Sequence, residues 1–345
     1  MKRKKIMKHR YIGRSGLRVS PICMGTMTFG AAADKKESFK IMDKAYDAGI
    51  NFYDTAELYP IPPDTKWMGQ TESIVGEWLQ TKPRDSVILA TKVAGAASGW
   101  FVPPNRHGLT AIDRFHIEKA FEDSLRRLNT DYIDLYQMHW PDEIVPIEES
   151  MEAFDRLVQS GKVRYLGTSN DSAYGLAKAN SVAKYEKLAR FESVQNNFSL
   201  LHRRDLDGLN VAMRKEQVSA LPYSPLAGGI LTGKYNGPFL PAGARFTVYK
   251  NSPLARQQAQ ANRFLNDKTL SATAAYIEVA KRYDMDVTTM ATAWSKQHDF
   301  VASTIIGATN ANQLDATLAA MDLLLSDELM RDLDAVHATH LYPMG

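Results

Sequence analysis

The stretch Ile50-Asn51-Phe52-Tyr53-Asp54-Thr55-Ala56-Glu57-Leu58-Tyr59 joins a short apolar strand to an aspartate, with a tyrosine five residues later. Two later apolar segments have the same form. Val87-Ile88-Leu89-Ala90-Thr91-Lys92 ends in a lysine, and Ile133-Asp134-Leu135-Tyr136-Gln137-Met138-His139 ends in a histidine. Three buried-looking strands therefore each place an ionisable group at the carboxyl end. An α/β barrel keeps its catalytic residues at that end of its strands.

Strand-like and helix-like segments alternate along the rest of the chain. The predicted strands are 21–24, 50–54, 87–92, 133–139, 163–167, 193–197, 218–223 and 301–306. The predicted helices are about 37–48, 72–80, 113–128 and 147–159, stretches within 173–188 and 204–215, two or three between 254 and 298, one from about 310, and 327–338. Segment 226–252 is rich in glycine and proline and is predicted to be a long loop. Eight strands in this alternation predict an α/β fold with one parallel (β/α)8 TIM barrel.

The ends of the chain predict additions to this barrel. Segments 9–13 and 17–20 flank a turn and predict a β-hairpin that caps one end, while extra helices follow the last strand. Residues 1–8 are basic and are not followed by the apolar stretch of a signal peptide, so we expect a flexible tail. Residues 9–345 are then predicted to form one domain.

Composition excludes several classes of protein. The formal charge is 42 − 39 = +3, which is too small to argue for a nucleic-acid partner. No apolar run approaches the roughly 18 residues of a membrane span, so no membrane association is expected. The single cysteine, Cys23, excludes an internal disulfide and favours a cytoplasmic location. No metal site is predicted, and the sequence favours neither a monomer nor a homo-oligomer.

Around one barrel mouth, Asp54, Tyr59, Lys92 and His139 suit the reduction of a carbonyl group. A nearby ammonium group lowers the pKa of a tyrosine, so Lys92 is expected to act on Tyr59 while Asp54 holds Lys92 in place. His139 is expected to orient a substrate oxygen, and Tyr59 to donate a proton to it as a nicotinamide supplies the hydride. Each residue alone also has a structural explanation: a cap, a strand-end lysine or a buried histidine. Their matched positions on three successive strands favour the functional one.

These four residues resemble the catalytic tetrad of the aldo/keto reductases. The segments 167–170, 195–196, 223–228 and 306–314 are similar to the cofactor segments of that family and occur in the same order. Segments 56–63 and 137–141 resemble the bacterial Tas-like branch. The resemblance implies a barrel that uses NADPH/NADP+ without a Rossmann domain, and no Gly-x-Gly-x-x-Gly follows a strand in this chain.

The same resemblance implies roles for the cofactor segments. Ser169, Asn170 and Gln195 would hold the nicotinamide carboxamide, because hydroxyl and amide groups can donate to it and accept from it, and Tyr223 would stack on the ring. The other implied cofactor residues are Gly25, Thr26, Met27, Asp54, Ser224, Pro225, Leu226, Gly228, Lys234, Arg245, Ile306, Gly307, Thr309, Asn310 and Gln313. The last three would lie at the adenosine phosphate, where a helix begins. Family members often carry Lys or Arg at the position of Asn310, so the preference for NADPH over NADH is expected to be modest.

The predicted substrate is a small carbonyl compound. Its pocket is expected to include Phe29, Tyr59, Trp100, His139 and Trp140. Two other functions remain open at this point: a nicotinamide-binding regulatory subunit similar to the potassium-channel β subunits, and a barrel isomerase or lyase without a nucleotide. The presence of all four tetrad residues favours the enzyme.

Overall fold

The computed structural model describes residues 9–97 and 108–344. The predicted tail 1–8 and the predicted pocket residue Trp100 lie outside these ranges. The assignment of residues 9–345 to a single domain stays a prediction.

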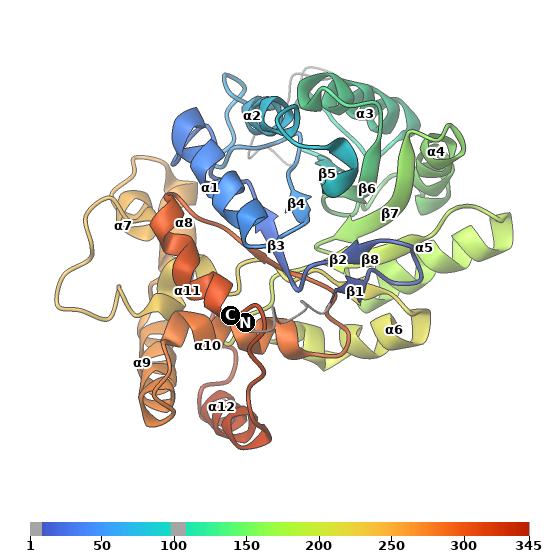
Figure 1. The fold of residues 1–345 in the computed structure, drawn as a ribbon. Helices are drawn as coiled ribbons and strands as arrows, with labels where there is room; N and C mark the ends of the chain where they lie inside the picture. The colour runs from blue at the N-terminus through green and yellow to red at the C-terminus, as the bar shows by residue number, and fades with distance from the viewer. Residues whose placement is uncertain (1–8, 98–107, 345) are drawn as a thin grey trace, which may run out of the picture.

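Eight parallel strands form the centre of the molecule (Figure 1). In sheet order they are β10 (Thr304–Ile306), β3 (Ile22–Gly25), β4 (Phe52–Asp54), β5 (Ile88–Val93), β6 (Ile133–Met138), β7 (Val163–Ser169), β8 (Phe191–Gln195) and β9 (Ser219–Ala220). Parallel bridges Ala220–Val301 and Tyr223–Ile305 join β9 to the chain around β10. The sheet therefore closes on itself, and the predicted (β/α)8 barrel is confirmed.

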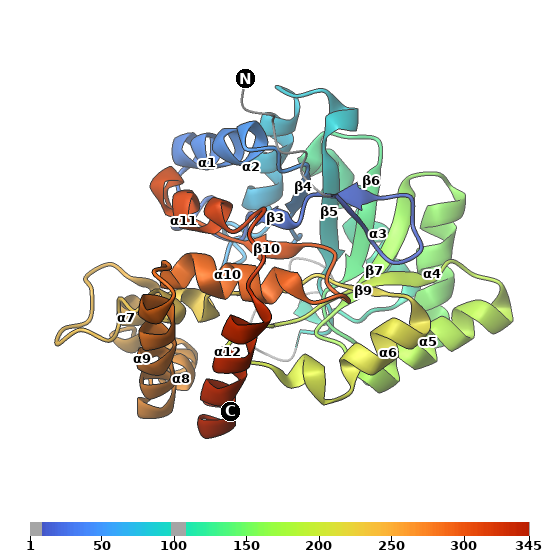
Figure 2. The ribbon, with the colours of Figure 1, turned by 60° about the horizontal axis from the view of Figure 1, so that its bottom comes forward.

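Helices surround this barrel (Figure 1). They are α1 (Lys35–Asp47), α2 (Gln70–Leu79), α3 (Arg114–Leu128), α4 (Ile147–Gln159), α5 (Ala173–Glu186), α6 (Leu209–Glu216), α7 (Arg245–Lys250), α8 (Ala255–Phe264), α9 (Asp267–Arg282), α10 (Val287–Gln297), α11 (Leu314–Ala319) and α12 (Asp327–Thr339). Short 3-10 turns lie at η1 (Arg84–Ser86), η3 (Arg204–Asp207), η4 (Ala227–Thr232) and η5 (Ala311–Gln313). In both ribbon views α9 and α12 lie at the periphery (Figure 2).

The N-terminal hairpin closes the end of the barrel opposite the predicted site. Its strands are β1 (Arg10–Tyr11) and β2 (Arg18–Val19), which pair antiparallel. The turn between them donates to side chains near the strand starts: the amide of Gly13 to Ser219 Oγ at 2.8 Å and that of Gly16 to Tyr165 Oη at 3.0 Å. The predicted hairpin cap is therefore confirmed, and the carboxyl ends of the strands are left for chemistry.

Two hydrophobic layers hold this arrangement. The inner layer fills the barrel and consists of Ile12, Leu17, Val19, Cys23, Phe52, Ala90, Leu135, Leu221, Ala302 and Ile305. The larger outer layer packs the strands against the helices and includes Trp78 and Trp294, both fully buried. Because alternate residues of a strand point to opposite faces, strands such as β4 and β6 contribute to both layers, Phe52 and Leu135 to the inner one and Tyr53 and Tyr136 to the outer one.

The structure corrects the prediction for segment 226–252. This segment contains η4 and the helix α7, so it is only partly a loop. Phe246 and Tyr249 are one helical turn apart on α7, and both are buried. Phe246 stacks on Phe264 with the ring centroids 4.6 Å apart. A six-residue helix gains little from its own hydrogen bonds, so these tertiary contacts stabilise a helix that local sequence does not predict.

Candidate active site

Lys92 is the centre of the predicted catalytic group. Its ammonium lies 2.6 Å from Asp54 Oδ2, 2.8 Å from the carbonyl oxygen of Thr55 and 3.4 Å from the Tyr59 hydroxyl. The Lys92 side chain is fully buried and that of Asp54 nearly so. The ring of His139 meets the ring of Tyr59 edge-on, with centroids 5.7 Å apart. The structure thus brings the four predicted catalytic residues together at the carboxyl ends of β4, β5 and β6.

Two glutamines complete the environment of Asp54. Gln137 and Gln195 both donate to Asp54 Oδ1, at 3.0 and 2.9 Å, and Gln195 also donates to Gln137 Oε1 at 3.1 Å. No role was predicted for Gln137. Its signal in the sequence was a polar residue two positions before His139, and so on the same face of β6. Both N–H groups of the Gln195 side chain therefore already donate hydrogen bonds within the protein, and only its Oε1 is left to accept one from a nicotinamide carboxamide.

The ionisation of this group differs in part from the prediction. Burial raises the pKa of Tyr59 above its ordinary value, and the charge of Lys92, which acts in the opposite direction, does not outweigh it. The expected lowering of the Tyr59 pKa by Lys92 is therefore smaller than the effect of burial. Burial alone would lower the pKa of Lys92, but Asp54 and Tyr59 raise it above its ordinary value. At neutral pH the lysine is charged and the phenol keeps its proton.

His139 is suited to binding rather than to titration. Burial, and then the charge of Lys92, lower the pKa of His139 well below its ordinary value. Its backbone amide donates to Val93 O at 3.0 Å, and its carbonyl accepts from Asn170 Nδ2 at 2.8 Å. Nδ1 of the ring is buried without a hydrogen-bond partner among the described residues. A neutral imidazole fixed in this way can orient a substrate oxygen without transferring its own charge.

The residues predicted at the nicotinamide lie beside this group. Ser169 Oγ donates to Gln195 O at 2.7 Å, and Asn170 Nδ2 lies 3.2 Å from Ser169 Oγ. Asn170 has a positive φ of 53° and accepts from the Tyr223 hydroxyl at 2.8 Å. Amide and hydroxyl groups from the ends of β7 and β8 and the segment after β9 therefore converge next to His139.

Two cations lie together along the segment predicted for the pyrophosphate. Burial and the neighbouring charge of Arg245 lower the pKa of Lys234. The ion pairs of the described residues include neither side chain. A Cβ on Gly229 would lie 3.0 Å from Lys234 Nζ, and one on Gly228, where φ is 65°, would lie 2.6 Å from Phe246. Adjacent cations over a glycine turn fit an anionic group such as a diphosphate.

In the turn predicted to hold the adenosine phosphate, several backbone amides already donate to side chains of the protein. Gln313 Oε1 accepts from the amide of Thr309 at 2.9 Å, and Asn310 Oδ1 accepts from the amide of Gln313 at 3.3 Å. The amide of Ala311 donates to the carboxylate of Glu37 on α1 at 2.9 Å. The Glu37 carboxylate, which also pairs with Lys40 Nζ at 2.9 Å, thus lies where a phosphate was expected, and the sequence did not predict it here.

The remaining predicted cofactor residues lie at the same end of the barrel. Gly25 ends β3, and a Cβ there would lie 2.6 Å from Ile305 Cγ2 and 2.9 Å from the carbonyl oxygen of Ile306, the last residue of β10. Thr26 Oγ1 donates to the carbonyl oxygen of Asp54 at 2.9 Å, so this segment borders the catalytic group. Met27 directly follows Thr26. Ser224, Pro225 and Leu226 lead into η4, and a Cβ on Gly307 would meet no atom within 4 Å.

The structure places two of the predicted substrate-pocket residues. Phe29 is fully buried and belongs to the outer hydrophobic layer, and its part in the pocket stays a prediction. Trp140 is part of a small apolar cluster with Leu58 and Ala94, and its ring lies 5.0 Å from that of His139. Its Nε1 donates to Ala96 O at 3.2 Å. An apolar wall therefore borders Tyr59 and His139.

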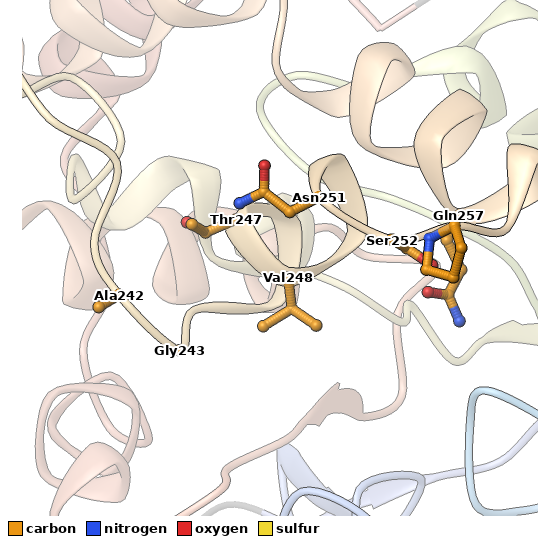
Figure 3. Close-up of a pocket in the computed structure, with 8 residues that line it drawn as sticks. Ala242, Gly243, Thr247, Val248, Asn251, Ser252 and Gln257 are labelled. Atoms are coloured by element: carbon orange, nitrogen blue, oxygen red, sulfur yellow. The ribbon is translucent and has the colours of Figure 1, made fainter.

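A surface cavity of about 560 Å³ lies elsewhere, around α7 and the turn that precedes α8 (Figure 3). Thr247, Val248 and Asn251 belong to its wall, and the four predicted catalytic residues do not. Within residues 9–97 and 108–344, no group of three or more His, Cys, Asp or Glu side chains is arranged to hold a metal ion. The helices of this described part include none that is both long and apolar enough to span a membrane.

Comparison with known proteins gives a consistent result. The model of the Aldo/keto reductase family matches residues 21–338. Protein tas of Escherichia coli is 36% identical over 98% of this chain and 99% of its own length. The uncharacterized oxidoreductase YrpG of Bacillus subtilis is 35% identical, and a probable voltage-gated potassium channel subunit beta of Oryza sativa is 34% identical, each over 96% of both chains. The similarity therefore extends over nearly the whole length of each protein.

Proposed function

The chain belongs to the aldo/keto reductase family, and from this premise we propose that it reduces aldehydes or ketones to alcohols with NADPH, using Tyr59 as the proton donor. Membership of the family makes it an oxidoreductase of carbonyl compounds. The choice of NADPH, the role of each residue and the small-molecule substrate belong to the proposal.

One observation carries the proposal most directly: a buried ammonium group lies between a carboxylate and a phenol. Lys92 is 2.6 Å from Asp54 and 3.4 Å from the Tyr59 hydroxyl. A lysine buried only for packing would need one counter-ion, and Asp54 is sufficient. The additional approach to Tyr59 places a positive charge where a phenolate forms when the proton leaves.

The proposed mechanism assigns a task to each side chain. Ser169, Asn170 and Gln195 would hold a nicotinamide, which would supply the hydride for the carbonyl carbon. His139, neutral and buried, orients the carbonyl oxygen, and Tyr59 transfers its proton to that oxygen as negative charge develops. Lys92 stabilises the resulting phenolate, and Asp54, held by Gln137 and Gln195, keeps Lys92 charged and in place. The apolar side chains around Trp140 exclude water from the reacting groups.

Turnover of a generic aromatic aldehyde with NADPH tests the proposal. We expect consumption of NADPH, followed by its absorbance, together with formation of the matching alcohol. The rice relative is described as a probable channel subunit, which gives a specific reason to consider a regulatory nicotinamide-binding protein. NADPH binding without turnover over a panel of aldehydes and ketones would support that second function and reject the first.

Cofactor choice gives a further prediction. We expect NADPH to bind more tightly than NADH, by less than about tenfold in dissociation constant. Thr309 and Gln313 can serve the 2′-phosphate, but the Glu37 carboxylate beside Ala311, whose charge Lys40 only partly offsets at 2.9 Å, opposes it. Fluorescence titration with both cofactors measures the two constants. Equal constants would remove the assignment of the 2′-phosphate to this turn.

A variant pair separates the effect of Glu37. Glu37→Gln removes the charge and keeps the shape, so we expect NADPH to bind about threefold more tightly with NADH unchanged, since a partly exposed charge contributes up to about 1 kcal/mol. Glu77→Gln is the matched control, because Glu77 is an exposed carboxylate on the neighbouring helix α2 that pairs with Lys35. Equal effects of the two variants would indicate only the change in overall charge.

A further inference from the structure

A second buried acid–base pair lies behind the catalytic group. Glu57 and His116 have side chains that are 2% and 0% exposed, and Glu57 Oε1 lies 3.4 Å from His116 Nε2. Neither residue touches the four predicted catalytic side chains through any hydrogen bond of the described residues. Glu57 belongs to the stretch that carries Asp54 and Tyr59, whereas His116 lies in the first turn of α3.

The Glu57 and His116 side chains both contact the backbone of Ala94, one at its amide and the other at its carbonyl oxygen. Glu57 Oε1 accepts from the amide of Ala94 at 2.6 Å, and His116 Nε2 lies 3.0 Å from the carbonyl oxygen of the same residue. The amide of Glu57 also donates to the carbonyl oxygen of Lys92 at 3.2 Å. The loop of Tyr59 is therefore attached by backbone and side chain to the end of β5, where Lys92 lies.

This attachment carries the geometry of the reaction. Tyr59 is two residues beyond Glu57, and Lys92 is two residues before Ala94. The backbone amide of His139 donates to Val93, between those two β5 positions. The end of β5 thus sets the positions of Tyr59, Lys92 and His139 relative to one another.

We propose that Glu57 and His116 are positioning residues that hold the Tyr59 loop against the end of β5 and so keep the Tyr59 hydroxyl within reach of Lys92. This inference rests on the proposed function. A buried carboxylate is costly unless it is hydrogen-bonded and paired. Glu57 satisfies that requirement through Ala94 and His116, and these contacts favour the observed position of the loop.

Three variants test the proposal. Glu57→Ala removes the contacts of Glu57 with Ala94 and His116. We expect kcat for an aromatic aldehyde to fall by about tenfold or more, because displacing the Tyr59 hydroxyl by about 1 Å is costly in catalysis. Its KM for the aldehyde and the NADPH dissociation constant should stay within about twofold. Glu57→Gln keeps an oxygen that can accept from Ala94 and should restore most of kcat.

Glu72→Ala is the matched control. Glu72 is also a fully buried carboxylate. It accepts from Thr91 at 2.5 Å and from Arg127 at 2.7 Å, so its hydrogen bonds among the described residues do not reach the Tyr59 loop. We expect Glu72→Ala to lower the melting temperature at least as much as Glu57→Ala while leaving kcat within about twofold. Equal losses of kcat in both alanine variants, or no loss in Glu57→Ala, would overturn the proposal.

The pH profile gives a readout that loss of stability alone does not move. Reduction needs protonated Tyr59, so its rate falls as the pH rises through the pKa of Tyr59. Burial has the largest effect and raises that pKa, the charge of Lys92 lowers it, and Asp54 raises it. The other ionisable rings near the hydroxyl are His139, which is neutral, and Tyr223, whose pKa burial raises to about 12. Displacing Tyr59 changes both its burial and its distance from Lys92, so the alkaline limb of Glu57→Ala should move from its wild-type position while that of Glu72→Ala does not, and an unshifted limb in Glu57→Ala would count against the proposal.

Two further measurements keep the test decisive. If Glu57→Ala does not fold, Glu57→Asp replaces it, because its carboxylate is one methylene too short to reach Ala94, and the same losses are expected in smaller measure. Crystal structures with NADP+ need no turnover: Tyr59 should leave hydrogen-bond reach of Lys92 in Glu57→Ala and stay in Glu72→Ala. If the wild type is inactive but Tyr59 is displaced in Glu57→Ala, the proposed function alone is rejected. If the wild type is active but Tyr59 is not displaced in Glu57→Ala, the positioning role alone is rejected.

Discussion

Replacing Tyr59 by phenylalanine is expected to lower kcat for aldehyde reduction by about 10³–10⁴-fold and to leave the NADPH dissociation constant within about twofold. The change deletes one oxygen and keeps the ring that meets His139. A positioned general acid contributes about 10²–10⁴-fold, and the same hydroxyl also stabilises the developing alkoxide, so the upper part of that range applies.

Tyr53→Phe is the matched control for this variant. Tyr53 lies on β4, is fully buried, and donates from its hydroxyl to Met42 O at 3.1 Å, outside the catalytic group. Its loss should lower stability by about 1 kcal/mol and leave kcat unchanged. A fall in kcat of less than about tenfold in Tyr59→Phe would identify another proton donor. His139 is then the next candidate, although its lowered pKa makes it a neutral donor.

Lys92→Met is expected to abolish measurable carbonyl reduction while NADPH binding survives. The Met side chain resembles the lysine stem, but Tyr59 loses the cation that stabilises its phenolate. The variant should also lower the free energy of unfolding, because removing one partner of a buried ion pair typically costs about 3–5 kcal/mol. Gln137 and Gln195 still donate to Asp54 and so reduce this loss. Thermal unfolding and single-turnover kinetics measure the two effects separately.

The double variant Asp54→Asn with Lys92→Met separates stability from catalysis. The amide introduced by Asp54→Asn carries no charge, and its oxygen can still accept from the two glutamines, so most of the stability lost in the single variant should return. Catalysis should not return, because the cation near Tyr59 is still missing. Recovery of turnover in the double variant, or near-normal turnover in Lys92→Met, would show that Lys92 has only a structural role.

The positions of the main chemical groups could be predicted from local sequence. Asp54, Lys92 and His139 each follow a short apolar run, and parallel strands of a barrel bring such ends together. Helix 113–128 was predicted because its apolar residues recur at helical spacing, and helix 147–159 was predicted at its observed bounds, with its end marked by Gly161. The short helix α7 was missed because its stability comes from Phe246 packing on Phe264, which lies 18 residues away in sequence.

The sequence by itself determined the barrel, its hairpin cap and the residue types at its mouth, because these follow from periodicity, turn residues and strand order. Only the tertiary structure decided which groups touch: that Gln137 and Gln195 hold Asp54, that Glu37 reaches the turn at Ala311, and that Phe29 lies in the core. It also decided that the pKa of Tyr59 is raised. Burial, which raises it, depends on all surrounding elements, whereas Lys92, which lowers it, could be found from the sequence of one strand. Contacts and desolvation join residues that are distant in sequence, and local patterns do not record them.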